Sequence, residues 1–186
     1  MTNDQMGWVD ERNAELEKIG SEGYFNIVEG DNRIQLLTHC APLPQVYDAG
    51  TRKYRVAEEG DKNISIKGLC WVLQDGKVKQ AKLPYTVVKA IRELQNDPDY
   101  QFEAFPMPRL INVKAKNAGS KEVEYTVIPS PKEVTVAAEI LTELATKPTP
   151  EDVVEKIKNK GKQVEEVDGV KYPEEEVNPE DIPFGN

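Results

Sequence analysis

The sequence predicts a mainly β protein with one helix inserted between its strands. Gln74-Asp75-Gly76 separates two runs in which apolar and polar residues alternate, and an Asp-Gly turn between such runs is typical of a β-hairpin. Residues 84–94 then place apolar side chains at helical spacing, with Pro84 at the start. A second alternating pair of runs surrounds residues 117–120. These three observations set the fold class.

The strands follow from the same alternation along the chain. They are expected at residues 24–28, 33–39, 64–73, 77–83, 110–116 and 122–128, and the segment 45–56 is expected to contain a turn at Ala49-Gly50. Pro42 and Pro44 are expected to interrupt the β structure after residue 39, because proline cannot donate to a strand ladder. For the same reason Pro129 and Pro131 are expected to close the β region.

The helices are expected at residues 10–19, 84–94, 134–146 and 150–160. Gly20 and Gly23 end the first of them. The last begins at Thr149-Pro150-Glu151-Asp152, which supplies an N-cap, a proline in the first turn and early carboxylates. Beyond Gly161 the sequence is acidic and contains prolines, which predicts disorder.

About five strands with one inserted helix is the composition of an OB-fold barrel, although a generic α+β sheet fits the strand count nearly as well. We therefore expect one core domain with appendages. The expected segments are an N-terminal arm or short helix at 1–23, an OB-fold domain at 24–132, a helical extension at 133–162 and a disordered acidic tail at 163–186.

Composition narrows the class of protein. Of the 186 residues 38% are hydrophobic and the mean hydropathy is −0.61, which predicts that part of the chain is solvated. No apolar run has the length of a membrane helix and residues 1–10 do not resemble a signal peptide, so a cytoplasmic location is expected. Cys40 and Cys70 are too few for a disulfide framework, and adding His39 does not complete a zinc site. No metal or cofactor is expected.

The formal net charge of −9 is unevenly distributed. Residues 33–132 hold sixteen basic and eleven acidic residues, whereas the segments at 1–32 and 164–186 are strongly acidic. A basic middle between acidic ends is the asymmetry expected of a core that binds a polyanion and a tail that mimics one. Single strands are held by such basic grooves together with aromatic rings on which bases stack.

The candidate contacts combine these two residue types. Tyr54 has only charged neighbours, which favours stacking, whereas Trp71 shares a strand face with both Lys67 and Leu69 and could be either core or platform. The expected DNA-binding residues are Arg33, Arg52, Lys53, Tyr54, Arg55, Lys67, Trp71, Lys77, Lys79, Lys82, Lys114 and Lys116. With one histidine, no Gly-rich phosphate loop and no recognisable catalytic constellation, the sequence does not predict an enzyme.

The order of short motifs resembles a known family. Gly30-Asp31-Asn32-Arg33-Ile34, Trp71 before the Asp-Gly hairpin, the helix leading into Asn96-Asp97-Pro98, and Tyr125-Thr126-Val127-Ile128-Pro129 together are similar to phage-encoded single-stranded-DNA-binding proteins of the OB-fold type. The resemblance implies sequence-independent coating of single strands in DNA replication, recombination and repair, without catalysis. It also implies the cytoplasm of a bacterial host.

The C-terminal Asp181-Ile182-Pro183-Phe184 resembles the acidic tip with which bacterial single-stranded-DNA-binding proteins dock replication and repair enzymes, except that two residues follow the phenylalanine here. The residues that this likeness assigns to partner binding are Glu180, Asp181, Ile182, Pro183 and Phe184. Three alternatives stay open: a non-enzymatic protein-interaction adaptor with a DNA-mimicking tail, an accessory subunit of a nuclease or polymerase, and RNA in place of DNA. A monomer and a homodimer are both compatible with the sequence.

Overall fold

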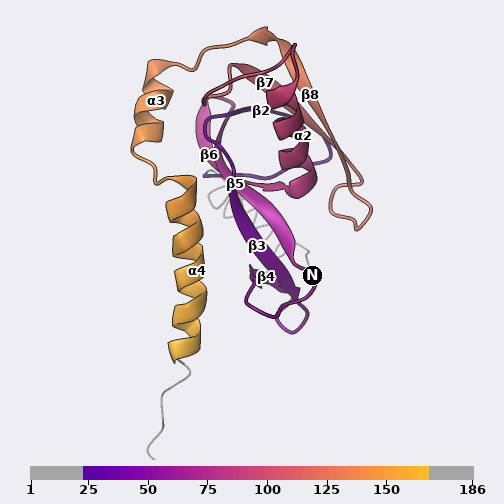
Figure 1. Cartoon of the computed structure of the whole chain (residues 1–186), viewed down its shortest axis with the longest axis vertical. Helices are drawn as coiled ribbons and strands as arrows, with labels where there is room; N and C mark the ends of the chain where they lie inside the picture. Colours follow the sequence, from indigo (N-terminus) through magenta and orange to yellow (C-terminus); the bar gives the residue numbers. More distant parts are fainter. Residues whose placement is uncertain (1–22, 168–186) are drawn as a thin grey trace, which may run out of the picture.

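The computed structural model describes residues 23–167, and this part of the chain is mainly β with helices (Figure 1). The strands are β1 (Tyr24–Phe25), β2 (Gly30–Leu36), β3 (Ala41–Asp48), β4 (Lys53–Val56), β5 (Ser65–Gln74), β6 (Lys77–Pro84), β7 (Arg109–Lys116) and β8 (Glu124–Glu133). The helices are α2 (Tyr85–Asn96), α3 (Ala138–Ala145) and α4 (Pro150–Val167). The helix expected at 10–19 and the acidic tip lie outside the described residues.

The strands form one mixed sheet in the order β1-β6-β5-β2-β7-β8, with β3 pairing to β5 and β4 to β3. Of the strands that the structure describes, β1 alone runs parallel to its neighbour, β6. The sheet curls, because β2 pairs with β5 near its end and with β7 along most of its length. Among the described strands β8 pairs only with β7, so the curled sheet does not close through hydrogen bonds.

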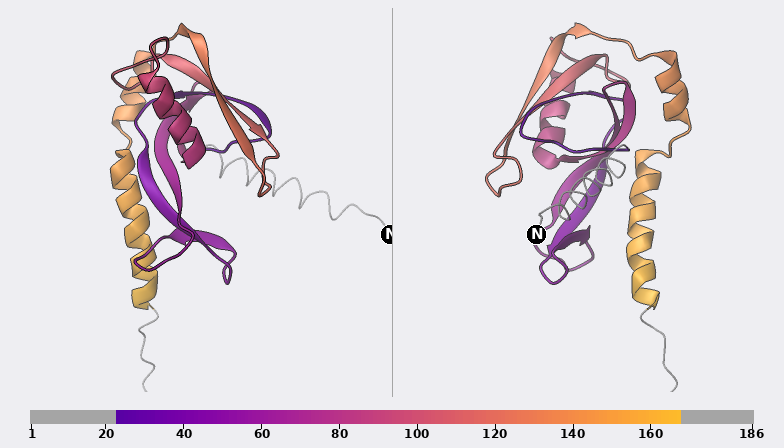
Figure 2. Two further views of the ribbon diagram at one scale, coloured as in Figure 1. Left: turned by 45° about the vertical axis from the view of Figure 1, so that its right-hand side comes forward. Right: turned by 180° about the vertical axis from the view of Figure 1, so that it is seen from behind.

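Two apolar clusters pack on opposite faces of the sheet. Inside the curl, α2 contributes Val87 and Ile91 to a buried core with side chains of β2, β5, β6 and β7. On the other face of β3, β5 and β6, a second cluster collects Trp71 and receives Val153 and Val154 of α4. The views in Figures 1 and 2 agree that α2 lies on one side of these strands and the α3–α4 segment on the other.

The two strongest sequence signals are confirmed. β5 and β6 form the predicted hairpin, and Asp75 and Gly76 at its turn both have positive φ, 51° and 74°, which two-residue hairpin turns of this kind require. The inserted helix is α2, which begins directly after Pro84. The helix expected at 150–160 is also present, but it continues to Val167 and so extends beyond the point at which disorder was expected.

The predicted effect of the prolines is wrong at four positions. Pro42 and Pro44 lie within β3, and Pro129 and Pro131 lie within β8. The Pro44 carbonyl accepts a hydrogen bond from Ala57 N at 3.0 Å, so this residue directs its backbone polar atoms away from β5. At Pro42 of β3, and at Pro129 and Pro131 of β8, the described sheet has a neighbouring strand on one side only, so a missing N–H on the open side costs no ladder bond.

None of the helices within residues 23–167 combines the length and the apolar character needed to cross a bilayer.

Candidate nucleic-acid interface

The predicted contact residues of β5 and β6 are divided between the two faces of the sheet. Lys82 lies opposite Leu69 and so shares a face with Trp71. Lys79 lies opposite Val72 and Lys77 opposite Gln74, which places both on the reverse face. Lys79 also donates a hydrogen bond to Gln74 Oε1 at 3.0 Å. These lysines therefore do not line one groove.

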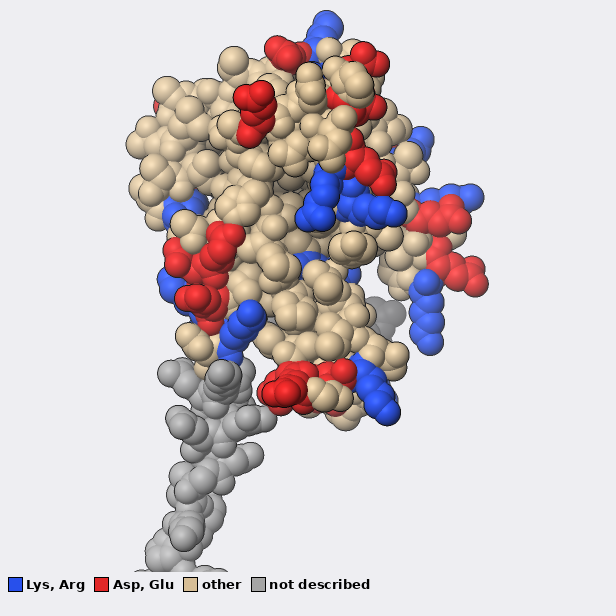
Figure 3. Space-filling model, viewed as in Figure 1, with Lys and Arg blue, Asp and Glu red and all other residues tan. Residues whose placement is uncertain are grey.

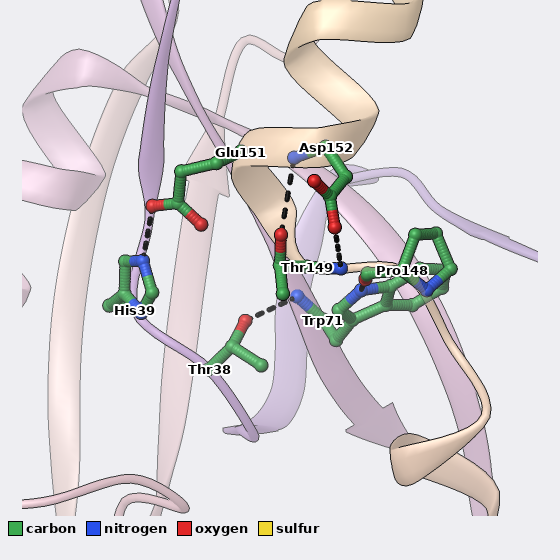
Figure 4. A network of polar contacts seen from close by, with 7 residues as sticks. All are labelled: Thr38, His39, Trp71, Pro148, Thr149, Glu151 and Asp152. Atoms are coloured by element: carbon green, nitrogen blue, oxygen red, sulfur yellow. Dashed lines mark hydrogen bonds and ion pairs between the residues drawn. The ribbon is translucent and has the colours of Figure 1, made fainter.

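Trp71 is a core residue in this structure rather than a stacking platform. Its side chain is only 7% exposed, and its indole Nε1 donates a hydrogen bond to the Pro148 carbonyl at 2.9 Å (Figure 4). The Lys147 ammonium lies 5.8 Å from the ring centroid, and Val153 and Val154 belong to the same apolar cluster. The segment joining α3 to α4 thus covers the face on which a base would stack.

The β3–β4 hairpin carries four of the predicted residues on its surface. Tyr54 is 58% exposed and makes an edge-to-face contact with Tyr47 directly opposite, with ring centroids 5.4 Å apart. Arg55 forms a fork to Asp61 with distances of 2.7 and 2.8 Å, and this hydrogen bond raises the pKa of the arginine. Arg52 and Lys53 are exposed as well. The hairpin therefore offers one aromatic surface and two cations, in addition to Arg55, whose charge is paired with that of Asp61.

On the outer face of β2, β7 and β8, cations alternate with carboxylates. Lys114 lies opposite Asp31, and Lys116 lies opposite Glu124. Arg33 stands across from Asn112, whose amide donates a hydrogen bond to Asp31 at 2.9 Å. Opposite charges at such cross-strand positions attract each other, which weakens the field that a phosphate would feel. On the face seen from the direction of Figure 1, Figure 3 shows basic and acidic side chains interspersed, without a continuous basic strip.

An open groove of about 470 Å³ lies where β5, α2 and β8 begin. Its lining residues are Ile64, Ser65, Ile66, Lys67, Pro84, Tyr85, Thr86, Val123 and Tyr125. Tyr85 is 55% exposed, Ile64 47% and Ile66 44%, so the groove offers apolar and aromatic surface to a ligand. Its lining includes one cation and no carboxylate. Of the predicted residues, only Lys67 lines it.

The start of α2 adds a second attraction for anions to this groove. Pro84 occupies the N-cap position without a capping side chain, and no acidic residue stands in the first turn. The first N–H groups of a helix lack intrahelical partners and carry the positive end of its dipole, so they favour phosphate or carboxylate. Tyr85 and Thr86 in this first turn line the groove, which brings a stacking ring and anion-binding amides together.

The sequence reasoning missed this groove for an identifiable reason. Tyr85 falls within the helix expected at 84–94 and Tyr125 within the strand expected at 122–128, and neither is among the expected contact residues. The available signal was parity, since Ile64 and Ile66 stand on the opposite face of their strand from Lys67 and Leu69. That parity also places Ile64 and Ile66 with the buried Cys70 and Val72, so the exposure of the two isoleucines became visible only in the structure.

Comparison of the chain with protein-family models, curated proteins and solved structures found no match. Within residues 23–167, no three His, Cys, Asp or Glu side chains are grouped so that they could hold a metal ion.

Proposed function

We propose that this chain binds single-stranded nucleic acid, DNA in the first place, without sequence preference and without catalysis. The observation that carries the proposal is the groove at the start of α2, where exposed Tyr85 adjoins Lys67 and uncapped helix amides with no carboxylate in the lining. A ring accepts any base by stacking, and the cation and amides accept the phosphate. The β3–β4 hairpin offers the same combination of an aromatic ring and cations, through the exposed Tyr54, Arg52 and Lys53.

The element order supports an OB-type barrel as the framework of this site. Counting β2 with β3 as one bent strand, the chain continues through β5, β6, α2, β7 and β8, so five strand units enclose one helix. OB folds are partly open barrels that bind oligonucleotides on their second and third strands and on the loops joining strands 1–2 and 4–5. Ile64 and Val123 of the groove belong to the corresponding loops, as does the β4 hairpin.

The acidic end of the chain has a separate proposed role. Residues 168–186 contain six carboxylates and one lysine, closing on Ile182-Pro183-Phe184. We propose that Glu180, Asp181 and this apolar tip recruit replication, recombination or repair proteins while the groove holds the single strand. This part of the proposal depends on the resemblance of the tip, which lies outside the described residues.

The decisive experiment is fluorescence anisotropy of the full chain with labelled oligo-dT and with a duplex of equal length, titrated with salt. Binding should favour the single strand and weaken as salt rises. Tyr85→Ala should lower the affinity roughly 5- to 150-fold, the equivalent of one lost stacking contact. Lys67→Gln should reduce the slope of log affinity against log salt by about 0.7, the contribution of one phosphate contact.

Tyr24→Ala on β1 and Lys158→Gln on α4 are matched controls, because both residues are exposed and lie outside the groove lining. Both control variants should leave the oligo-dT affinity and its salt dependence unchanged. Wild-type protein that ignores oligo-dT at modest ionic strength would end the proposal. Wild-type affinity in the Tyr85→Ala and Lys67→Gln variants would show that the groove is not the site that binds the single strand.

A polypeptide-binding adaptor is the second candidate, and the aliphatic part of the groove favours it. Ile64, Ile66 and Val123 offer no stacking surface but would suit apolar side chains of a peptide. An adaptor would show no salt-dependent binding to either oligonucleotide in the same titration. Replacing oligo-dT by oligo-U tests RNA, because stacking surfaces accept either sugar.

A further inference from the structure

The two cysteines occupy facing positions on adjacent strands. Ala41 of β3 pairs with Leu69 of β5, so continuing the same antiparallel register by one residue sets Cys40 directly opposite Cys70. Facing residues in antiparallel strands have Cα atoms about 4.5 to 5.5 Å apart. A disulfide needs a Cα separation of about 4.4 to 6.8 Å. Backbone geometry therefore allows a bond between these two residues without displacement of either strand.

Both thiols lie on the same face of the sheet, the one that α2 covers. A methyl group at Gly68, which shares its strand face with Cys70, would lie 3.0 Å from Cβ and 3.5 Å from Sγ of Cys40. The Cys70 side chain belongs to the buried core inside the curl, and Cys40 packs against that core. The thiols therefore meet within the packed space beneath α2.

The two thiols differ in access and in acidity. Cys70 is fully buried, whereas Cys40 is half-buried and lines a pocket of about 190 Å³ with His39 and Arg92. A hydrogen bond from Cys70 lowers the pKa of Cys40 against the effect of burial, and the positive charge of Arg92 assists. The same hydrogen bond, together with burial, raises the pKa of Cys70 well above its ordinary value. An oxidant entering this pocket reaches Cys40 first.

We propose that Cys40 and Cys70 form an oxidation site, in which Cys40 reacts with a peroxide and Cys70 then closes a disulfide between β3 and β5. The Cys40 thiolate attacks one peroxide oxygen, the O–O bond breaks, and hydroxide leaves while Cys40 becomes a sulfenic acid. The Cys70 sulfur then attacks the Cys40 sulfur, the S–O bond breaks, and the leaving oxygen departs as water with the Cys70 proton. Hydrogen peroxide is reduced to water and the two thiols are oxidised by two electrons.

The bond would tie the start of β3 to β5, because Cys40 directly precedes β3. Reduction by a small dithiol would restore both thiols by exchange. The proposal is independent of what the groove binds.

The test treats full-length wild-type protein with a small excess of hydrogen peroxide and follows the mass of the intact chain. We expect a monomer that has lost two hydrogen atoms, a peptide crosslink between residues 40 and 70, and recovery of both thiols with dithiothreitol. A disulfide between two chains as the main product would overturn the proposal. So would free thiols, or a stable sulfenic acid on the wild-type chain.

Variants separate the roles of the two residues. Cys70→Ser should accumulate a dimedone-reactive sulfenic acid at Cys40, whereas Cys40→Ser should leave Cys70 unmodified because it is buried. Arg92→Gln should shift the pH profile of Cys40 alkylation by iodoacetamide upward, and Lys89→Gln on the same helix should not. His39 also lines the pocket, so His39→Gln is measured alongside. Equal reactivity of Cys40 and Cys70 in the single-serine variants would contradict the assigned order.

Discussion

Trp71 illustrates how much a single position reveals from sequence. Its parity correctly placed it with Leu69, but the sequence left it open whether that face is covered. The cover comes from Pro148, 77 residues away, to which the indole donates its hydrogen bond. Alternation within a strand defines which residues share a face, whereas the partner of that face depends on long-range packing that no local pattern encodes. Lys67 shares this strand face with Trp71, but it lies near the start of β5 and lines the groove.

The core position of Trp71 makes a specific prediction about stability. Trp71→Phe removes the indole N–H but keeps an aromatic ring, so the free energy of unfolding should fall by about 1 kcal/mol for the lost hydrogen bond. Trp71→Ala should cost about 3 to 5 kcal/mol, because it opens a cavity beneath α4. Urea unfolding measures both changes. Oligo-dT affinity of the folded Trp71→Phe variant should match wild type, and a large loss of affinity without a stability change would restore the stacking interpretation.

Asp61 provides a residue-scale prediction for pH. The Arg55 guanidinium, followed by the Glu58 N–H, holds the pKa of this carboxyl at about 2. A depressed pKa means that the ion pair contributes stability above the ordinary carboxyl value of about 3.9, and that this contribution is lost as pH falls through about 2. NMR titration should show Asp61 returning toward the ordinary range in Arg55→Gln. An unchanged midpoint in that variant would contradict the assigned cause.

At the scale of elements, α4 shows why the motif Thr149-Pro150-Glu151-Asp152 correctly predicted where a helix begins. The predicted cap is formed by reciprocal hydrogen bonds: Asp152 N donates to Thr149 Oγ1, and Thr149 N donates to Asp152 Oδ2, both at 3.2 Å (Figure 4). These contacts span three residues, which is why sequence alone contains them. The His39–Glu151 contact, in which His39 lowers the pKa of Glu151, joins the same helix end to the segment before β3. That contact spans 112 residues and no local pattern predicts it.

Removing the cap should destabilise α4. Thr149→Ala is expected to lower the free energy of unfolding by about 0.5 to 2 kcal/mol, because a backbone N–H at the start of α4 loses its acceptor. Thr142→Ala is the matched control, since its hydroxyl donates only to the Ala138 carbonyl within α3. Hydrogen exchange of the α4 amides should accelerate in the first variant alone. Equal acceleration of exchange in both variants would show that the cap does not stabilise α4.

At the scale of the molecule, the excess of basic residues in 33–132 is correct as a count, but it did not predict one basic surface. The strands distribute these residues over both faces of the sheet and set Lys114 and Lys116 opposite acidic residues. Strand alternation could be counted from the sequence, whereas the curl of the sheet and the placement of α3–α4 could not. The groove unites residues from three places, 64–67, 84–86 and 123–125, and only tertiary structure brings them together.

The acidic end gives a prediction for the complete chain. Deleting residues 168–186 leaves α4 intact and removes six carboxylates, so oligo-dT binding should tighten at low salt and change little at high salt. Phe184→Ala keeps every charge and should leave DNA affinity unchanged while abolishing recruitment of partner enzymes. Anisotropy at two salt concentrations measures the first effect. Weaker binding after the deletion would refute competition between tail and DNA.

The prolines within β3 and β8 have a consequence for how copies of the molecule meet. An exposed strand edge with free N–H groups is a template on which another chain can add a strand and begin a fibril. Pro42, Pro129 and Pro131 remove donors along the stretches where these two strands lack a second neighbour in the described sheet. Many copies crowded side by side would therefore be less able to add strands to one another along these two stretches.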